Sequence, residues 1–315
     1  MTDAQPQNPQ WERQILEKLA FASLAEQRKS RNWGILFKTL SLIYLFLLLF
    51  LVSGWLGKTD MVGGGGKHTA LVELKGVIDA EGGASADKII TGLQEAFKDK
   101  NTKGIILRIN SPGGSPVQAG YINDEIKRLR QLYPEIPLYA VVQDICASGG
   151  YYVAVAASKI FVDKASLVGS VGVLMDGFGF TGAMEKLGIE RRLLSAGTNK
   201  GFLDPFSPVN PAHQAFAKKM LAEIHAQFIA VVREGRGERL KETPDTFSGL
   251  IWTGEQSLKM GLADALGSTE YVAREVIKAE DIVDFSTQEN LAERLAKRLG
   301  AASARSFGEW ALHAR

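Results

Sequence analysis

Short apolar runs alternate with amphipathic stretches along the chain from residue 68 onward. Four runs have the length and the aliphatic composition of buried strands, and they lie at 70–74, 105–109, 139–142 and 160–162. Stretches with apolar residues at helical spacing lie between or beyond them, at 87–97, 122–132, 152–157 and 211–232. This alternation predicts an α/β domain with a largely parallel sheet over 68–282.

The most apolar part of the chain precedes that domain. Residues 39–57 carry no charge and are long enough to form one transmembrane helix. More basic residues precede this run than follow it, which predicts a cytoplasmic N-terminal segment at 1–38 and a domain on the extracytoplasmic side of the membrane. The absence of a small-residue cleavage site argues against a removed signal peptide.

The segments around the predicted span have patterns of their own. Residues 11–27 have the spacing of an amphipathic helix, and 58–67 form a glycine-rich linker. The tail at 283–315 has leucines at four-residue steps among basic residues. It predicts an amphipathic helix that contacts a membrane surface or another protomer, and a merely solvated helix fits the same pattern.

The chemistry suggested by the chain centres on Ser148. It follows the run at 139–142 and precedes a helical stretch, so it is predicted at a strand-to-helix turn, where unpaired amides stabilise an oxyanion. Gly149 leaves room for a substrate carbonyl, and Gly113 and Gly114, after the run at 105–109, are predicted to supply a second donor. A serine N-cap followed by tightly packed glycines fits the same residues.

Lys200 is the base that the sequence offers to this serine. A serine hydroxyl needs a base to take its proton, and serine–lysine pairs are known to do this. Burial away from carboxylates favours the neutral lysine that such a base requires. No histidine stands in a recognisable catalytic motif, no metal-ligand spacing or cofactor motif is present, and the single cysteine, Cys146, has the pattern of a small buried residue.

Several ordered motifs resemble those of one protease family. They are Asn110 to Gly114, Ala147 to Tyr152, Gly169 to Val173, the Lys200 segment and Trp252 to Asp264. The chain resembles signal peptide peptidase A type proteases, in the short single-repeat form of the S49 serine peptidase family. The resemblance implies a fold of the ClpP/crotonase type, a repeated ββα spiral, preceded here by the predicted transmembrane helix.

The resemblance also implies roles for single residues. Ser148 matches the nucleophile, Lys200 the general base, and Ser170 a serine that orients the lysine amine. The Trp252 to Asp264 motif is interpreted as fold closure and assembly. In duplicated relatives the lysine and the serine belong to different copies, so this single-copy chain is expected to form a ring-shaped homo-oligomer that shares the pair between protomers.

The expected activity is that of a membrane-anchored serine endopeptidase without a cofactor. Its expected substrates are signal peptide remnants and other short or unfolded chains, and its expected surroundings are the lipid bilayer of the bacterial cytoplasmic membrane. A formal net charge of +2 over 315 residues gives no reason to expect nucleic acid as a partner. A crotonase-like acyl-CoA enzyme and a noncatalytic membrane scaffold are the alternatives.

Overall fold

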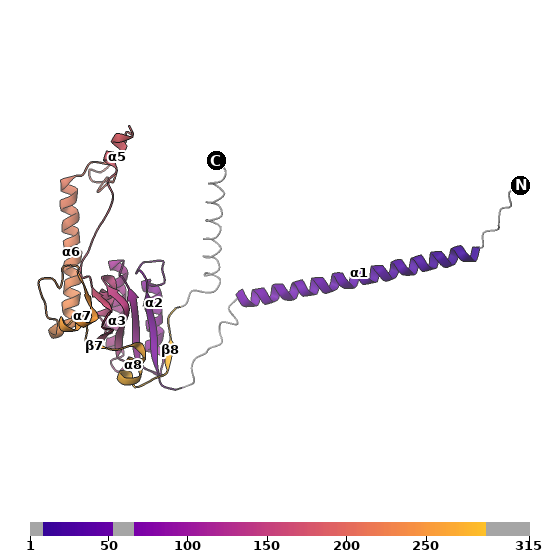
Figure 1. Ribbon diagram of the computed structural model, residues 1–315, viewed down its shortest axis with the longest axis horizontal. Coiled ribbons are helices and arrows are strands. Elements are labelled where there is room, and N and C mark those ends of the chain that lie inside the picture. Colours follow the sequence, from indigo (N-terminus) through magenta and orange to yellow (C-terminus); the bar gives the residue numbers. More distant parts are fainter. Residues whose placement is uncertain (1–8, 53–65, 288–315) are drawn as a thin grey trace. The chain divides into compact units, whose positions relative to one another are not determined.

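The computed structural model describes residues 9–52 and 66–287 (Figure 1). The chain divides into two compact units, one of which contains the helix α1 (Pro9–Val52) and the other the remaining described residues. α1 is continuous over 44 residues, so the amphipathic stretch at 11–27 and the start of the apolar run at 39–57 belong to one helix. Most of the linker at 58–67 and most of the tail at 283–315 lie outside the described residues.

The predicted span at 39–57 needs a separate statement, because its last residues lie outside the described part of the chain. Within the part that is described, no helix combines the length and the apolar composition needed to cross a membrane.

The second unit is the predicted α/β domain. Its strands are β1 (His68–Lys75), β2 (Thr102–Ser111), β3 (Leu138–Ala147), β4 (Lys159–Val162), β5 (Leu167–Gly169), β6 (Ile251–Thr253), β7 (Ala265–Leu266) and β8 (Ile282–Asp284). Its α-helices are α2 (Ala86–Lys98), α3 (Pro116–Leu132), α4 (Gly149–Ala154), α5 (Thr181–Lys186), α6 (Pro211–Arg236), α7 (Gly254–Lys259) and α8 (Thr269–Tyr271). A 3-10 turn, η1 (Gly237–Arg239), and a π-helix, η2 (Val272–Ile277), complete it. The predicted α/β class is confirmed.

The strands form one sheet in the order β6-β5-β3-β2-β1-β8, with β4 and β7 beside β3. All neighbours are parallel except β5 and β6. β3 changes partner along its length, since 139–141 pair with β4 and 145–147 pair with β5. Its register against β2 shifts between these halves, as expected for a bulge, which bends a strand. The bend brings the end of β3 beside β5.

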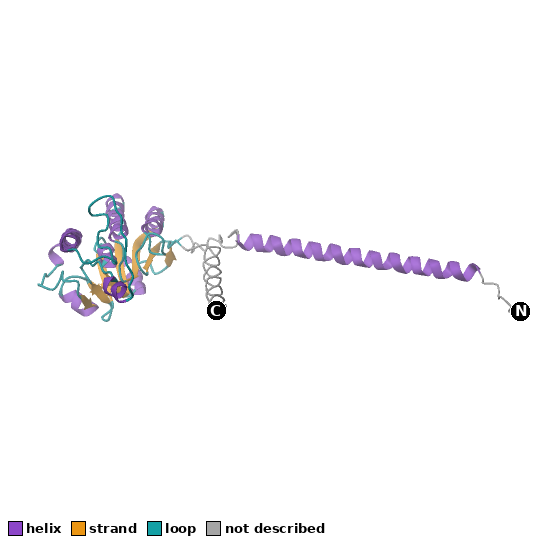
Figure 2. Ribbon diagram, turned by 90° about the horizontal axis from the view of Figure 1, so that it is seen from above, coloured by secondary structure: helices purple, strands orange, loops and turns teal. Residues whose placement is uncertain are grey.

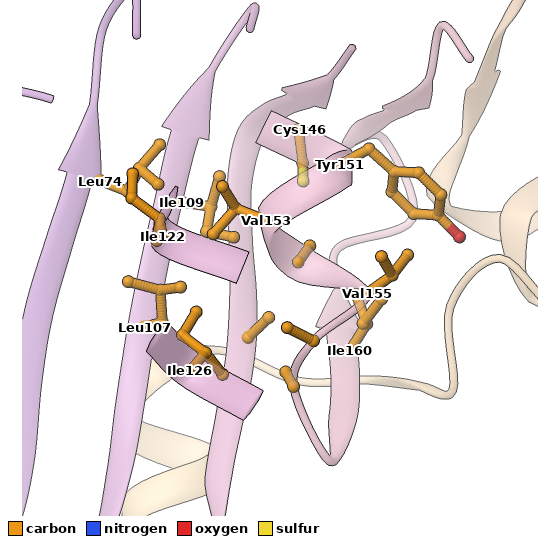
Figure 3. Close-up of a cluster of buried hydrophobic side chains, with 14 of the residues drawn as sticks. Leu74, Leu107, Ile109, Ile122, Ile126, Cys146, Tyr151, Val153, Val155 and Ile160 are labelled. Atoms are coloured by element: carbon orange, nitrogen blue, oxygen red, sulfur yellow. The ribbon is translucent and has the colours of Figure 1, made fainter. Parts of the chain in front are cut away.

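Alternate strand residues build the core on the two faces of the sheet. On one face, Leu74, Leu107 and Ile109 point toward Ile122 and Ile126 of α3, and all five are fully buried (Figure 3). α2, α4 and α6 pack in the same cluster (Figures 1 and 2). On the other face a smaller cluster lies under η2. The core therefore fixes the ends of β2 and β3, where the sequence places the candidate chemistry.

The end of the Trp252 to Asp264 motif closes the domain through a buried ion pair. Arg236, at the end of α6, is 1% exposed, and its guanidinium donates two hydrogen bonds of 2.8 Å to the Asp264 carboxylate. Asp264 also accepts from the Ile160 amide, which ties it to β4. Burial alone would raise the pKa of Asp264, but hydrogen bonds from Arg236 and Ile160 and the charges of Arg236 and Arg239 hold it below its usual value.

Replacing Arg236 by leucine is expected to lower the free energy of unfolding by about 3–5 kcal/mol, because it leaves a carboxylate buried without its partner. The exposed pair of Arg233 and Glu242 provides the control, and Arg233→Leu should cost at most about 1 kcal/mol. Urea unfolding measures both values. Equal losses in the two variants would contradict the structural role of Arg236.

The same ion pair predicts a dependence of stability on pH. Because the pKa of Asp264 is lower in the folded chain than in the unfolded one, its contribution is present above the unfolded value of about 3.9. It is lost as the pH falls through the folded value. Urea unfolding below pH of about 4 should therefore narrow the difference in stability between the wild type and Arg236→Leu.

Candidate active site

Ser148 lies in the turn between β3 and α4, as the sequence predicts. Its backbone adopts φ 51° and ψ −123°, a conformation that residues with side chains rarely occupy. The surrounding structure holds it there, because the Ser148 amide donates to the Gly169 carbonyl at 2.9 Å and the Ser148 carbonyl accepts from Tyr152 at the same distance. Strained residues of this kind cluster at functional sites.

The side chain of Ser148 does not cap α4. The hydroxyl makes no hydrogen bond to the first turn of the helix, so the interpretation of Ser148 as an ordinary N-cap is wrong. The residue is half-buried, while its neighbours Ala147 and Gly149 are buried. The hydroxyl is thus held at the end of β3 without the structural hydrogen bond that would occupy it.

The glycine turn after β2 packs directly against this serine. A Cβ added to Gly113 would lie 2.7 Å from the Ser148 Cβ and 2.6 Å from the Gly149 nitrogen. A Cβ added to Gly149 would lie 3.3 Å from the Gly114 nitrogen. The two loops predicted to form the oxyanion hole therefore meet, and only residues without side chains allow their backbones this close.

The three glycines differ in what their amides do. The Gly113 amide donates to the Ser111 hydroxyl at 3.1 Å, and its carbonyl accepts from Ile78. The amides of Gly114 and Gly149, by contrast, donate to no carbonyl in the turns and caps of the described residues. Gly114 and Gly149 are therefore the better pair of donors for an oxyanion, and Gly113 serves as the spacer between them.

Replacing Gly113 by alanine is expected to lower kcat for peptide hydrolysis by at least about 100-fold, the loss typical of a disrupted oxyanion hole. The new methyl group would collide with the Ser148 turn, and φ of Gly113 is +100°. Gly120, inside α3, is the control, because nothing lies within 4 Å of its added Cβ. Gly120→Ala should keep full activity, and full activity in Gly113→Ala would contradict the predicted packing.

Ser170 lies on the strand beside Ser148. β5 pairs with the end of β3 so that Ala147 is opposite Gly169, and Ser148 and Ser170 each follow these partners. Ser170 has φ 52°, which is again unusual for a residue with a side chain. Its amide donates to the Leu250 carbonyl at 2.7 Å. The structure thus brings Ser148, Ser170 and the glycine turns together.

Lys200 is not part of that group within the chain. It is exposed, and its neighbour Asn199 contacts His213 in the first turn of α6, with 3.3 Å between the Asn199 Oδ1 and the His213 Nε2. His225, farther along α6, contacts Val171 next to Ser170. Twelve helical residues separate the two histidines, which corresponds to about 18 Å along the axis. Figure 1 shows this end of α6, beside α5, away from the sheet.

Other groups that could replace the predicted residues are engaged elsewhere. Burial raises the pKa of the Cys146 thiol, which disfavours the thiolate that a nucleophile needs. His225 Nε2 lies 3.0 Å from the Val171 carbonyl, which can only accept, so this nitrogen carries its hydrogen and is no proton acceptor. In the described part of the chain no group of His, Cys, Asp and Glu is arranged to hold a metal ion.

Residues 130–283 match the family model described as peptidase family S49. This part of the chain belongs to that family. The matched segment contains the turns of Ser148 and Ser170, Lys200 and the closing motif at Trp252 to Asp264. The S49 resemblance expected from the sequence is thereby confirmed, and with it the expected ClpP/crotonase type of fold.

Relatives of the S49 segment occur in proteins of different names. A Na(+)/H(+) antiporter NhaA of Brucella melitensis biotype 1 is 44% identical over 177 residues, which are 56% of this chain and 24% of that protein. A serine protease SPPA, chloroplastic, of Arabidopsis thaliana is 30% identical over 200 residues, 63% of this chain and 29% of that protein. The chain therefore spans about a quarter of the length of these two relatives.

Among solved structures, the S49 segment is similar to a mutant of the 1510-N membrane-bound stomatin-specific protease. The match covers 71% of this chain and 99% of that one, at 15% identity and a TM-score of 0.44.

Proposed function

We propose that the chain is a serine endopeptidase in which Ser148 is the nucleophile and Lys200 of a neighbouring protomer is the general base. The observation that carries this proposal is the strained Ser148 turn packed against Gly113, with the amides of Gly114 and Gly149 beside it and bonded to no carbonyl in the described turns. Membership in an S49 peptidase family agrees with it.

The proposed reaction uses each of these groups once in each half. The Ser148 hydroxyl attacks the peptide carbonyl while the neutral lysine amine takes its proton. The amides of Gly114 and Gly149 donate to the oxyanion that forms. The lysine then protonates the leaving amine, and water repeats the sequence to release the acyl group. Ser170 orients the lysine amine.

Two features support a lysine from a neighbouring protomer. The Lys200 segment is attached to the far end of α6, about 18 Å from the contact of α6 with the Ser170 turn. The arm that carries it, residues 174–210, also exposes large apolar side chains, among them Leu194 at 96%, Leu174 at 80% and Phe178 at 79%. Apolar surface of this kind is typical of an interface, and we propose that it contributes to a ring-shaped homo-oligomer.

The proposed substrates are signal peptide remnants and other short or unfolded chains. An extended peptide can add to the sheet beside Ser148, with alternate side chains entering apolar pockets. We also propose that the protein acts at the bacterial cytoplasmic membrane through residues 39–57, with its N-terminus in the cytoplasm. The uncharged sequence of this segment and the basic residues before it support that location.

A fluorophosphonate probe tests the proposal on the purified full chain. The probe should label the wild type at Ser148, and the labelled sample should lose hydrolysis of an unfolded protein and of short apolar peptides. A crotonase-like enzyme would instead hydrolyse an acyl-CoA thioester, and a scaffold would do neither. Either of these results, with Ser148 unlabelled, would overturn the proposal.

A further inference from the structure

Helix α6 contacts both halves of the proposed site, at two histidines. His225 Nε2 lies 3.0 Å from the carbonyl of Val171, the residue after Ser170. His213 Nε2 lies 3.3 Å from the side-chain oxygen of Asn199, the residue before Lys200. Both partners are oxygens that accept, so both histidines donate. One rigid element therefore holds the Ser170 turn at one place and the Lys200 segment at another.

The Ser170 turn needs such support because its backbone is strained. Ser170 has φ 52°, and contacts around it hold the turn from the β6 side. The Ser170 amide donates to the Leu250 carbonyl at 2.7 Å, and a Cβ on Gly172 would lie 3.0 Å from the Gly249 Cα. Val171 is fully buried, and His225 takes up its carbonyl from the α6 side. His225 thus completes the enclosure of the turn.

The Lys200 segment depends on α6 in a similar way. The rings of Phe202 and His213 lie 5.3 Å apart, and Phe202 meets Phe216 edge-on at 5.7 Å. The Phe202 amide donates to the Asn199 carbonyl at 3.0 Å, which closes the turn that contains Lys200. His213 lies at the centre of these contacts, since it touches residues on both sides of Lys200.

We propose that α6 positions both halves of the site, with His225 holding the Ser170 turn beside the nucleophile and His213 holding the segment that presents Lys200. Both are positioning residues, because neither touches the reacting atoms in the described contacts. The proposal rests on the proposed function. It adds that each protomer uses the two ends of one helix for two different active sites.

The first experiment compares His225→Leu with His225→Gln in peptide hydrolysis. Leucine removes the donor, and kcat should fall by about 10- to 100-fold with KM within about twofold, as expected for a misplaced catalytic group. Glutamine keeps an N–H donor and should restore most of the activity. Thermal unfolding should stay unchanged in both variants. Equal losses in leucine and glutamine variants, or a loss that follows unfolding, would overturn the role of His225.

A double variant shows whether His225 acts through Ser170. If it does, His225→Leu should cause little further loss in a chain that already carries Ser170→Ala, because the group it positions is gone. Losses that multiply would mean that His225 affects activity by another route and would contradict the proposal. This comparison needs no assumption about which protomer supplies the lysine.

The second experiment assigns each histidine to one half of the shared site. In mixtures of Ser148→Ala and Lys200→Ala chains, the Lys200→Ala chain supplies the serine and the Ser148→Ala chain supplies the lysine. His225→Leu should remove the recovered activity only when placed in the serine-supplying chain, and His213→Leu only in the lysine-supplying chain. Each placement is the matched control of the other.

The outcomes separate the two proposals. Equal damage from both placements would overturn the positioning roles, since a general loss of structure does not depend on the placement. No recovery in verified mixed oligomers would instead overturn the shared dyad. In that case the single and double variants of His225 still decide whether His225 positions the Ser170 turn.

Discussion

Replacing Ser148 by alanine should abolish peptide hydrolysis, lowering kcat by at least about 10³-fold. The hydroxyl is the atom that attacks the substrate, and no other described group stands ready in its turn. Its amide and carbonyl bonds to Gly169 and Tyr152 involve only the backbone, so the fold should remain. Hydrolysis of an unfolded protein and of short apolar peptides measures the loss, and unfolding in urea checks the structure.

Cys146 provides the control for this substitution, because it lies two residues away and is the rival nucleophile. It is buried, and burial raises the pKa of its thiol. Cys146→Ala should therefore keep both activity and labelling by a fluorophosphonate. Activity that survives Ser148→Ala and disappears in Cys146→Ala would contradict the assignment of the nucleophile.

Replacing Lys200 by alanine should lower kcat as severely, by about 10³-fold or more, because Ser148 has no other base in the proposed mechanism. Arginine at this position should not restore activity, since a guanidinium does not release its proton in a protein. Lys186 is the matched control, because it is exposed in α5 on the same arm. Lys186→Ala should be fully active, and full activity in Lys200→Ala would contradict the dyad.

The parts of the fold that leave a long pattern in the sequence were predictable. β1, β2 and β3 each contain a run of apolar residues that is buried in the sheet, and α6 follows the spacing of its apolar residues. The Ser148 turn was predictable as well, because an apolar strand ends just before it. Its strained backbone was not, since a positive φ at serine has no signal in the sequence.

Other parts depend on contacts between distant residues. β5 and β6 have three residues each, too few to show a period, yet their pairing holds the Ser170 turn. The contact of His225 with Val171 joins residues 54 positions apart and could not be read from either one. The buried pair of Arg236 and Asp264 is similar, because only the closed fold brings the two charges together.

The separation of Lys200 from Ser148 is the point at which sequence reasoning and structure depend on each other. Motif order alone pairs the two residues, whereas the contacts of their segments with α6 lie about 18 Å apart within one chain. A second copy of the chain resolves this separation. Assembly then becomes a condition of activity rather than a consequence of it.

Mixing Ser148→Ala chains with Lys200→Ala chains tests this account most directly. Each variant alone should be inactive, and co-assembled chains of the full-length protein should recover part of the wild-type hydrolysis, because some sites then combine an intact serine with an intact lysine. Native mass spectrometry verifies that mixed oligomers have formed. Recovered activity in those oligomers is the predicted result, and complete inactivity in them would contradict a site shared between protomers.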